Sequence, residues 1–222
     1  SDKNVLKELK DGFDYLKKEA SISLVILMLC IVSLLVLPYD TLIPVFAKVI
    51  FKGDATTFGY ITSFIGVGAV ASTIMLASLK QSSSLRKILV IATVILGIGL
   101  ILFSFTNNFL LAIWFAVIVG FGAGAQFTTC NIIVQSEAPP AIRSRAISLM
   151  LTAIFGMLPL GSLVVGAVSE RIGAQTTLLW QGILSIVIAA VFYNILKKKH
   201  EAGKHINEEK LINAEEKFLE QA

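Results

Sequence analysis

The chain has 222 residues and a formal net charge of +4; 55% of its residues are hydrophobic and only 15% are charged. Its mean hydropathy is +0.80. Soluble domains carry about 25% charged residues, so these values exclude an ordinary soluble protein and indicate a membrane protein.

Six apolar stretches are long enough to cross a bilayer, which takes about 20 helical residues. They cover residues 20–47, 56–79, 88–105, 109–136, 146–168 and 177–196. Backbone amides in lipid must be satisfied within their own segment, and the short alternating strands of a barrel do not occur. We therefore predict an all-α membrane protein with six transmembrane helices.

Polar segments flank these spans. Residues 1–19 place four apolar residues at helical spacing among lysines: Leu6, Leu9, Phe13 and Leu16. This pattern predicts an amphipathic linker helix in the cytoplasmic interface, with a solvated linker as the alternative. Residues 197–222 form a charged cytoplasmic tail, which we expect to be either frayed or a weak amphipathic helix.

The basic residues predict the orientation of the spans. With six crossings, one side would hold Lys3, Lys7, Lys10, Lys17, Lys18, Lys80, Arg86, Lys87, Arg143, Arg145, Lys197, Lys198, Lys199, Lys204, Lys210 and Lys217. The other side would hold only Lys48, Lys52 and Arg171. By the positive-inside rule, both termini then lie in the cytoplasm. We expect a multi-pass protein of a bacterial plasma membrane. The positive charge reflects this topology, so we expect membrane lipids and no nucleic acid as partners.

The first span contains an unusual carboxylate. Asp40 lies between Pro38 and Pro44 and is the only acidic residue within the spans. The prolines remove two amide donors and loosen the helix there. We hypothesise that Asp40 lines the outer mouth of a central cavity and takes up a proton or contacts a cationic substrate group. Alternatively, it is an interfacial carboxylate that is hydrated or paired with Lys48.

The fourth span carries two patterns. Small residues recur every fourth position and predict close helix packing: Ala112, Ala116, Gly120 and Gly124. Further along, Thr128, Asn131 and Gln135 share one helical face. Polar side chains at this depth usually face a bundle interior or a wet cavity, so these three are candidates for a substrate cavity. They could instead only hydrogen-bond neighbouring helices.

Catalytic chemistry has no support in the sequence. The two histidines, His200 and His205, lie in the charged tail, and no nucleophile motif, phosphate loop or paired carboxylates occur in the spans. Cys30 and Cys130 lack metal-ligand spacing and are interpreted as small buried apolar side chains. We expect neither an enzyme, nor a metal site, nor a cofactor.

Three segments carry a resemblance to a known family. They are PYDTLIPVFAKVIF at 38–51, TCNIIVQSEAPPAIRSRAISLM at 129–150 and PLGSLVVGAVSERIGA at 159–174. They resemble the seventh helix, the junction of the tenth and eleventh helices, and the eleventh helix of major facilitator superfamily transporters. Within that superfamily the chain is similar to the branch of enterobactin-type exporters and drug-efflux permeases. The resemblance runs from about residue 6 to residue 196.

The resemblance implies the C-terminal six-helix half of a secondary transporter, made of two inverted three-helix repeats. It implies that a small molecule binds between the halves and crosses by alternating access coupled to proton antiport. Arg143 and Arg145 are candidates for the cytoplasmic gate, unless they only satisfy the positive-inside bias. Two departures stand out: the loop at 78–87, SLKQSSSLRK, lacks the acid of the family's loop motif, and Asp40 replaces an apolar residue and inherits no family role.

The partner implied is an N-terminal six-helix half, on the same polypeptide or on a separate chain. A fragment of a longer protein is the favoured interpretation, with a split transporter or a six-helix homodimer as alternatives. A competing class is a membrane scaffold or assembly subunit that does not transport, in which partner helices would seal the polar face of the fourth span.

Overall fold

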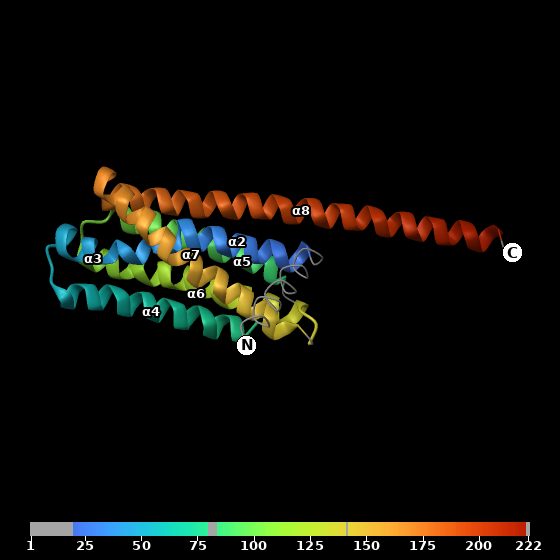
Figure 1. The fold of residues 1–222 in the computed structure, drawn as a ribbon, viewed down its shortest axis with the longest axis horizontal. Helices are drawn as coiled ribbons and strands as arrows, with labels where there is room; N and C mark the ends of the chain where they lie inside the picture. Colours follow the sequence, from blue (N-terminus) through green and yellow to red (C-terminus); the bar gives the residue numbers. More distant parts are fainter. Residues whose placement is uncertain (1–19, 80–83, 141, 221–222) are drawn as a thin grey trace, which may run out of the picture.

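The structure is a computed structural model that describes residues 20–79, 84–140 and 142–220, with side chains between Ile22 and Lys197. These residues form a bundle of long helices, and no strand occurs among them (Figure 1). The amphipathic helix expected at 1–19 lies outside the described residues.

Six long helices form the bundle. They are α2 (Ala20–Leu35), α4 (Ala55–Ala77), α5 (Leu85–Phe105), α6 (Phe109–Glu137), α7 (Arg143–Ile172) and α8 (Ala174–Glu220). In the described part of the chain, six helical segments are long and apolar enough to cross a membrane, the first being the composite segment Ile22–Ile50. The predicted fold class is thereby confirmed.

The helices pack in a definite order. α6 lies between α4 and α5, α5 also packs along α8, and α2 packs against α7. We call the end of the bundle that holds Ala77, Leu85, Glu137 and Arg143 the basic end, and the end that holds Phe105 and the turn after it the opposite end (Figure 1).

Glycines allow α4 and α6 to touch backbone to backbone. A Cβ added at Gly68 would lie 2.1 Å from the carbonyl oxygen of Val117, and one at Gly120 would lie 1.8 Å from that of Ile65. Any larger side chain would force the two helices apart, so this contact fixes the distance between them.

The first span is not one continuous α-helix. After α2 the chain forms a 3-10 helix, η1 (Leu37–Thr41), a short α3 (Ile43–Val45) and a π-helix, η2 (Phe46–Ile50). Pro38 and Pro44 cause the change, since each lacks the N–H that a regular α-helix would bond.

Two neighbouring helices brace this break. The Gln181 side-chain amide of α8 donates to the carbonyl oxygens of Leu35 and Val36, each at 3.3 Å. Gly161 of α7 lies against the Leu34 carbonyl, which a Cβ at Gly161 would approach to 2.2 Å. Pro38 is the residue that would have bonded this carbonyl in a regular helix, so the contact covers an acceptor that the proline leaves open.

The last helix extends well beyond the bundle. α8 runs without interruption from Ala174 to Glu220, and its final part projects past the basic end (Figure 1). The charged tail is therefore helical through Glu220.

Candidate functional site

Polar side chains of α6 and α4 meet near the basic half of the bundle. Thr128 and Asn131 are half-buried and Gln135 is exposed. The Thr128 hydroxyl oxygen lies 3.4 Å from that of Thr73 on α4. The Asn131 amide donates to the carbonyl of Phe127 at 3.2 Å, within its own helix. We call Thr73, Thr128, Asn131 and Gln135 the polar wall.

Helix α7 contributes two further polar side chains, both with hydroxyl groups. Ser148 and Thr152 are exposed near the start of α7, and the Thr152 hydroxyl donates to the Ser148 carbonyl at 2.8 Å. The polar wall and these two residues offer only hydroxyl and amide groups. Such groups can bind a polar molecule and orient it, but they cannot neutralise a formal charge.

Asp40 stands apart from the polar wall. It lies in η1, beyond the break in the first span, and its side chain is exposed whereas that of the preceding Tyr39 is buried. Among the described residues its carboxylate has neither a hydrogen bond nor an ion pair, so the suggested contact with Lys48 is not seen. Thr128 contacts Thr73 on α4, and no contact between Asp40 and Thr128 occurs among the described residues.

The two arginines proposed for a gate belong to a helix. Arg143 and Arg145 form the exposed first turn of α7, which begins three residues before the span predicted at 146–168. Their charges therefore project from the basic end at a fixed position on α7.

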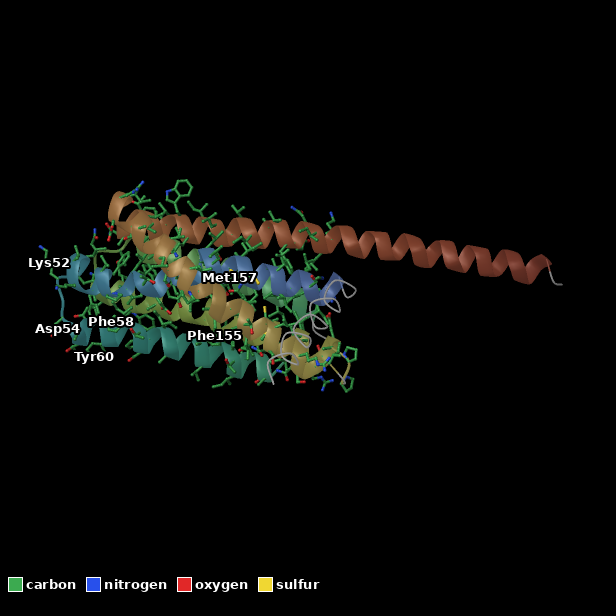
Figure 2. All side chains as sticks on the ribbon, in the orientation of Figure 1. Lys52, Asp54, Phe58, Tyr60, Phe155 and Met157 are labelled. Carbon is green, nitrogen blue, oxygen red and sulfur yellow. The ribbon has the colours of Figure 1, made fainter. Side chains whose placement is uncertain are left out.

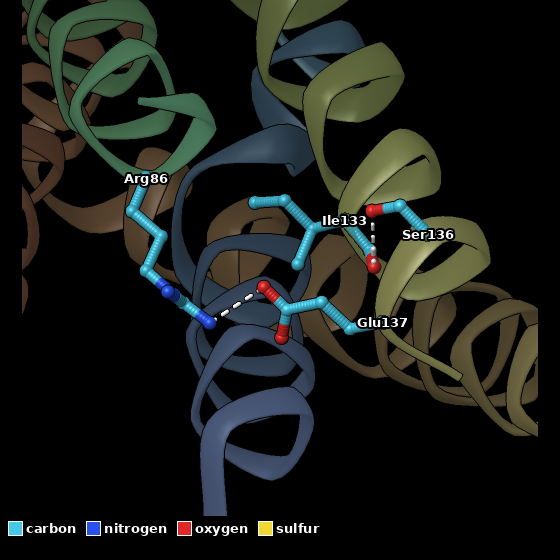
Figure 3. Close-up of polar contacts among 4 residues, drawn as sticks. All are labelled: Arg86, Ile133, Ser136 and Glu137. Carbon is cyan, nitrogen blue, oxygen red and sulfur yellow. Dashed lines mark hydrogen bonds and ion pairs between the residues drawn. The ribbon is translucent and has the colours of Figure 1, made fainter. Parts of the chain in front are cut away.

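An ion pair links two other residues at the basic end. The Arg86 guanidinium donates to the Glu137 carboxylate at 2.5 Å and so joins the first turn of α5 to the last turn of α6 (Figure 3). Both side chains are about one-third exposed, at 36% and 30%. Sequence reasoning counted Arg86 among the basic residues of this side but missed Glu137, an acid that directly follows the fourth predicted span.

The small residues predicted for packing lie on the buried side of α6. Ala112 and Ala116 are fully buried, and Gly120 faces the backbone of α4. A Cβ at Gly124 would lie 2.7 Å from both the Cα of Ala69 and the hydroxyl oxygen of Ser72. Gly120 and Gly124 therefore let α4 pack closely against α6 next to the polar wall.

Sequence reasoning missed the contacts of both Gln181 and Gly161 at the break. Gln181 is a side-chain amide in the middle of an apolar span, and that position was the available signal for a structural or functional role. Nothing in the sequence could tell which carbonyls it bonds, because they lie about 145 residues away along the chain.

The opposite end carries aromatic residues that suit a membrane interface. Phe58 and Tyr60 are exposed in the first turns of α4, close to the turn that holds Lys52 and Asp54 (Figure 2). Trp114 of α6 and Trp180 of α8 are also exposed, at 69% and 54%. Tyrosine and tryptophan collect where hydrocarbon meets headgroups, so these positions mark one boundary of the lipid-facing surface.

Comparisons with known proteins point to transport. The MFS_3 family, described as "Transmembrane secretion effector", matches residues 1–220. The chain is 28% identical over 170 residues to a staphyloferrin A transporter of Staphylococcus aureus, covering 75% of this chain and 42% of that protein. It is 25% identical over 155 residues to the multidrug efflux pump Tap of Mycolicibacterium fortuitum, covering 69% and 38%. The chain thus spans about two-fifths of the length of these relatives.

Proposed function

Because this chain belongs to the major facilitator superfamily, in its family of transmembrane secretion effectors, we propose that it is the C-terminal half of an efflux permease. The permease exports a small siderophore-like or drug-like molecule by alternating access, coupled to proton antiport. The names of two relatives, a staphyloferrin A transporter and a multidrug efflux pump, support export of a small molecule.

The observation that carries the proposal is the polar wall. Thr73 and Thr128 come from different helices and meet through their hydroxyls, while Gln135 is exposed. A polar surface at membrane depth is stable only where it contacts water, a polar ligand or partner helices. In the proposal this wall borders the substrate path, and Asp40 lies at its outer mouth.

A second six-helix half completes the path. Gly59 and Gly66 on α4, and Gly156 and Gly166 on α7, are open positions where an added Cβ would meet nothing within 4 Å. Open glycines on transmembrane helices allow another helix to approach closely. The exposed faces of α4 and α7 are therefore proposed as the surfaces that meet the other half, whether it belongs to the same polypeptide or to another.

The proposed orientation puts the basic end in the cytoplasm of a bacterial cell. Arg86 and Lys87 at the start of α5, and Arg143 and Arg145 at the start of α7, all lie at that end. Lys48 and Lys52 lie at the opposite end. This distribution follows the positive-inside rule, and the two arginines of α7 are proposed to border the cytoplasmic gate.

Cysteine accessibility tests the proposal in cells that express the complete transporter. Thr128, Asn131 and Gln135 are replaced singly by cysteine in a background with Cys30→Ala and Cys130→Ala. Labelling from the cytoplasmic side without substrate, and from the outer side in a second state, is the expected result. The matched control is Leu163→Cys, on an exposed apolar position of α7. If all three polar-wall cysteines stay protected in every state, the wall is sealed by helices and a scaffold role replaces transport.

A further inference from the structure

Four buried polar atoms in the bundle have no hydrogen-bond partner among the described residues. They are Ser33 Oγ on α2, Gln126 Nε2 and Thr129 Oγ1 on α6, and Gln181 Oε1 on α8. Each of these side chains is at most 2% exposed. Buried polar atoms in native proteins nearly always have a partner, so each requires one.

Packing contacts place α5, α6 and α8 in register at this depth. A Cβ at Gly97 of α5 would lie 2.7 Å from the carbonyl oxygen of Gly182 on α8, and the Ser185 hydroxyl donates to the Thr93 carbonyl at 2.8 Å. On the other side of α5, a Cβ at Gly122 of α6 would lie 2.4 Å from the backbone nitrogen of Leu96. Because α5 and α6 are antiparallel, Gln126, one turn beyond Gly122, lies level with Thr93.

The first span contacts α8 about one helical turn closer to the opposite end than Ser185. Gln181 precedes Ser185 by one turn of α8 and bonds the carbonyls of Leu35 and Val36. Ser33 lies less than one turn before Val36 and is fully buried. Thr129 lies one turn beyond Gln126 on α6. We call Ser33, Gln126, Thr129 and Gln181 the buried polar layer.

The buried polar layer differs from the polar wall. Thr128 turns toward α4 and is half-buried, whereas its neighbour Thr129 is fully buried and points elsewhere in the bundle. α6 therefore carries polar groups on two sides, and those of the buried polar layer are not needed to line a substrate path.

The four atoms have complementary hydrogen-bonding chemistry. Gln126 Nε2 can only donate, Gln181 Oε1 can only accept, and the hydroxyls of Ser33 and Thr129 can do both. A cation would be repelled by the Gln126 amide hydrogens and would find no carboxylate in the layer, while an anion would be repelled by Gln181 Oε1. Water is the ligand that serves donors and acceptors together. We propose that the buried polar layer is a binding site for ordered water that bridges α2, α6 and α8.

This site lies beside the break in the first span. The Gln181 amide nitrogen already serves the carbonyls of Leu35 and Val36, so its oxygen is the group left for water. Bound water would thus link Gln181, which hydrogen-bonds the first span at its break, to the polar side chains of α6. The inference concerns the bundle itself and holds whether or not the chain takes part in transport.

The first experiment is a stability comparison of the full chain in detergent micelles. Thr129→Val keeps the shape of the side chain and removes only its hydroxyl. If that hydroxyl binds water, we expect the unfolding equilibrium constant to rise about tenfold, because a hydrogen-bonded partner is left unsatisfied. The matched control is Thr177→Val, since Thr177 is equally buried and its hydroxyl bonds within its own helix to Gly173. A gain in stability, or a loss no larger than that of the control, overturns the proposal.

A second measurement covers the case in which Thr129→Val does not fold. A crystal structure of the parent chain, at a resolution that shows ordered water, is expected to contain density within hydrogen-bond distance of Gln126 Nε2 and Gln181 Oε1. The density beside Ser33 should be lost in Ser33→Ala, which removes only the hydroxyl oxygen. Finding these buried atoms dry in the parent structure would contradict the proposal.

Discussion

Gly161 of α7 packs directly on the carbonyl oxygen of Leu34 in α2, at the point where Pro38 withholds a hydrogen bond. The contact leaves no room for a side chain, because a Cβ would lie 2.2 Å from that oxygen. Close backbone packing thus covers the same turn of the first span in which the proline interrupts the α-helix.

Gly161→Ala should therefore destabilise the bundle by about 1–3 kcal/mol, the usual cost of overpacking a tight contact. The measurement is the free energy of unfolding in detergent, followed by circular dichroism. Gly156→Ala is the control on the same helix, because a Cβ there meets nothing within 4 Å. It should be neutral or stabilise by up to about 1 kcal/mol through helix propensity. Equal effects of the two substitutions would refute this account of the contact.

The ion pair at the basic end should contribute little. Arg86 and Glu137 are about one-third exposed, and pairs of this kind couple by about 0.2–1 kcal/mol. A double-mutant cycle with Arg86→Gln and Glu137→Gln measures that coupling free energy through unfolding in low salt. The coupling should fall as salt is added, since ions screen partly exposed charges. A coupling above about 2 kcal/mol would mean that lipid or protein shields the pair from water.

Asp54 should make the start of α4 sensitive to acid. Its carboxylate accepts hydrogen bonds from the backbone N–H groups of Thr57 at 3.2 Å and Thr56 at 3.0 Å. The Thr57 bond, with the Thr56 bond adding to it, lowers the pKa of Asp54 below its ordinary value. The stabilising effect is complete above the pKa of the unfolded chain and disappears as the pH falls through the lower pKa of the folded chain.

Carboxyl carbon chemical shifts followed through an acid titration measure this pKa directly. Asp54→Ala should increase amide hydrogen exchange at Thr56 and Thr57 at neutral pH. Asp54→Asn should preserve the cap, because asparagine is an equally good N-cap residue, but abolish its pH dependence. An Asp54 that titrates at or above its ordinary pKa would contradict the capping role.

Asp40→Asn tests the acidic residue between the two prolines of the first span. If Asp40 carries a proton during transport, the variant should lose the acid limb of the pH profile of efflux in cells with the complete transporter. Glu170→Gln is the control, since Glu170 is an exposed acid near the end of α7 that the mechanism does not use. An unchanged rate with an unchanged pH profile would remove Asp40 from the mechanism.

The sequence alone was enough to predict the six-helix fold, because long apolar segments leave the backbone only one way to satisfy its hydrogen bonds in lipid. Pro38 and Pro44 correctly indicated a loosened first span. They could not reveal that 3-10, α and π segments follow one another there, since that choice depends on the contacts of Gly161 and Gln181. The polar face of Thr128, Asn131 and Gln135 followed from helical spacing, but the meeting with Thr73 depends on how α4 packs on α6.

Helix α8 is so long that a small change in its tilt would displace its far end by a large distance. Its last 24 residues, from 197 to 220, continue the helix for about 35 Å at 1.5 Å per residue. Their base is anchored, because the Gly97–Gly182 contact ties α8 to α5 within the bundle. A tilt of α8 by only about 10° would therefore swing the far tip by about 6 Å. Rearrangements too small to detect among the packed helices would be magnified there, where a spectroscopic probe near Glu220 could report them.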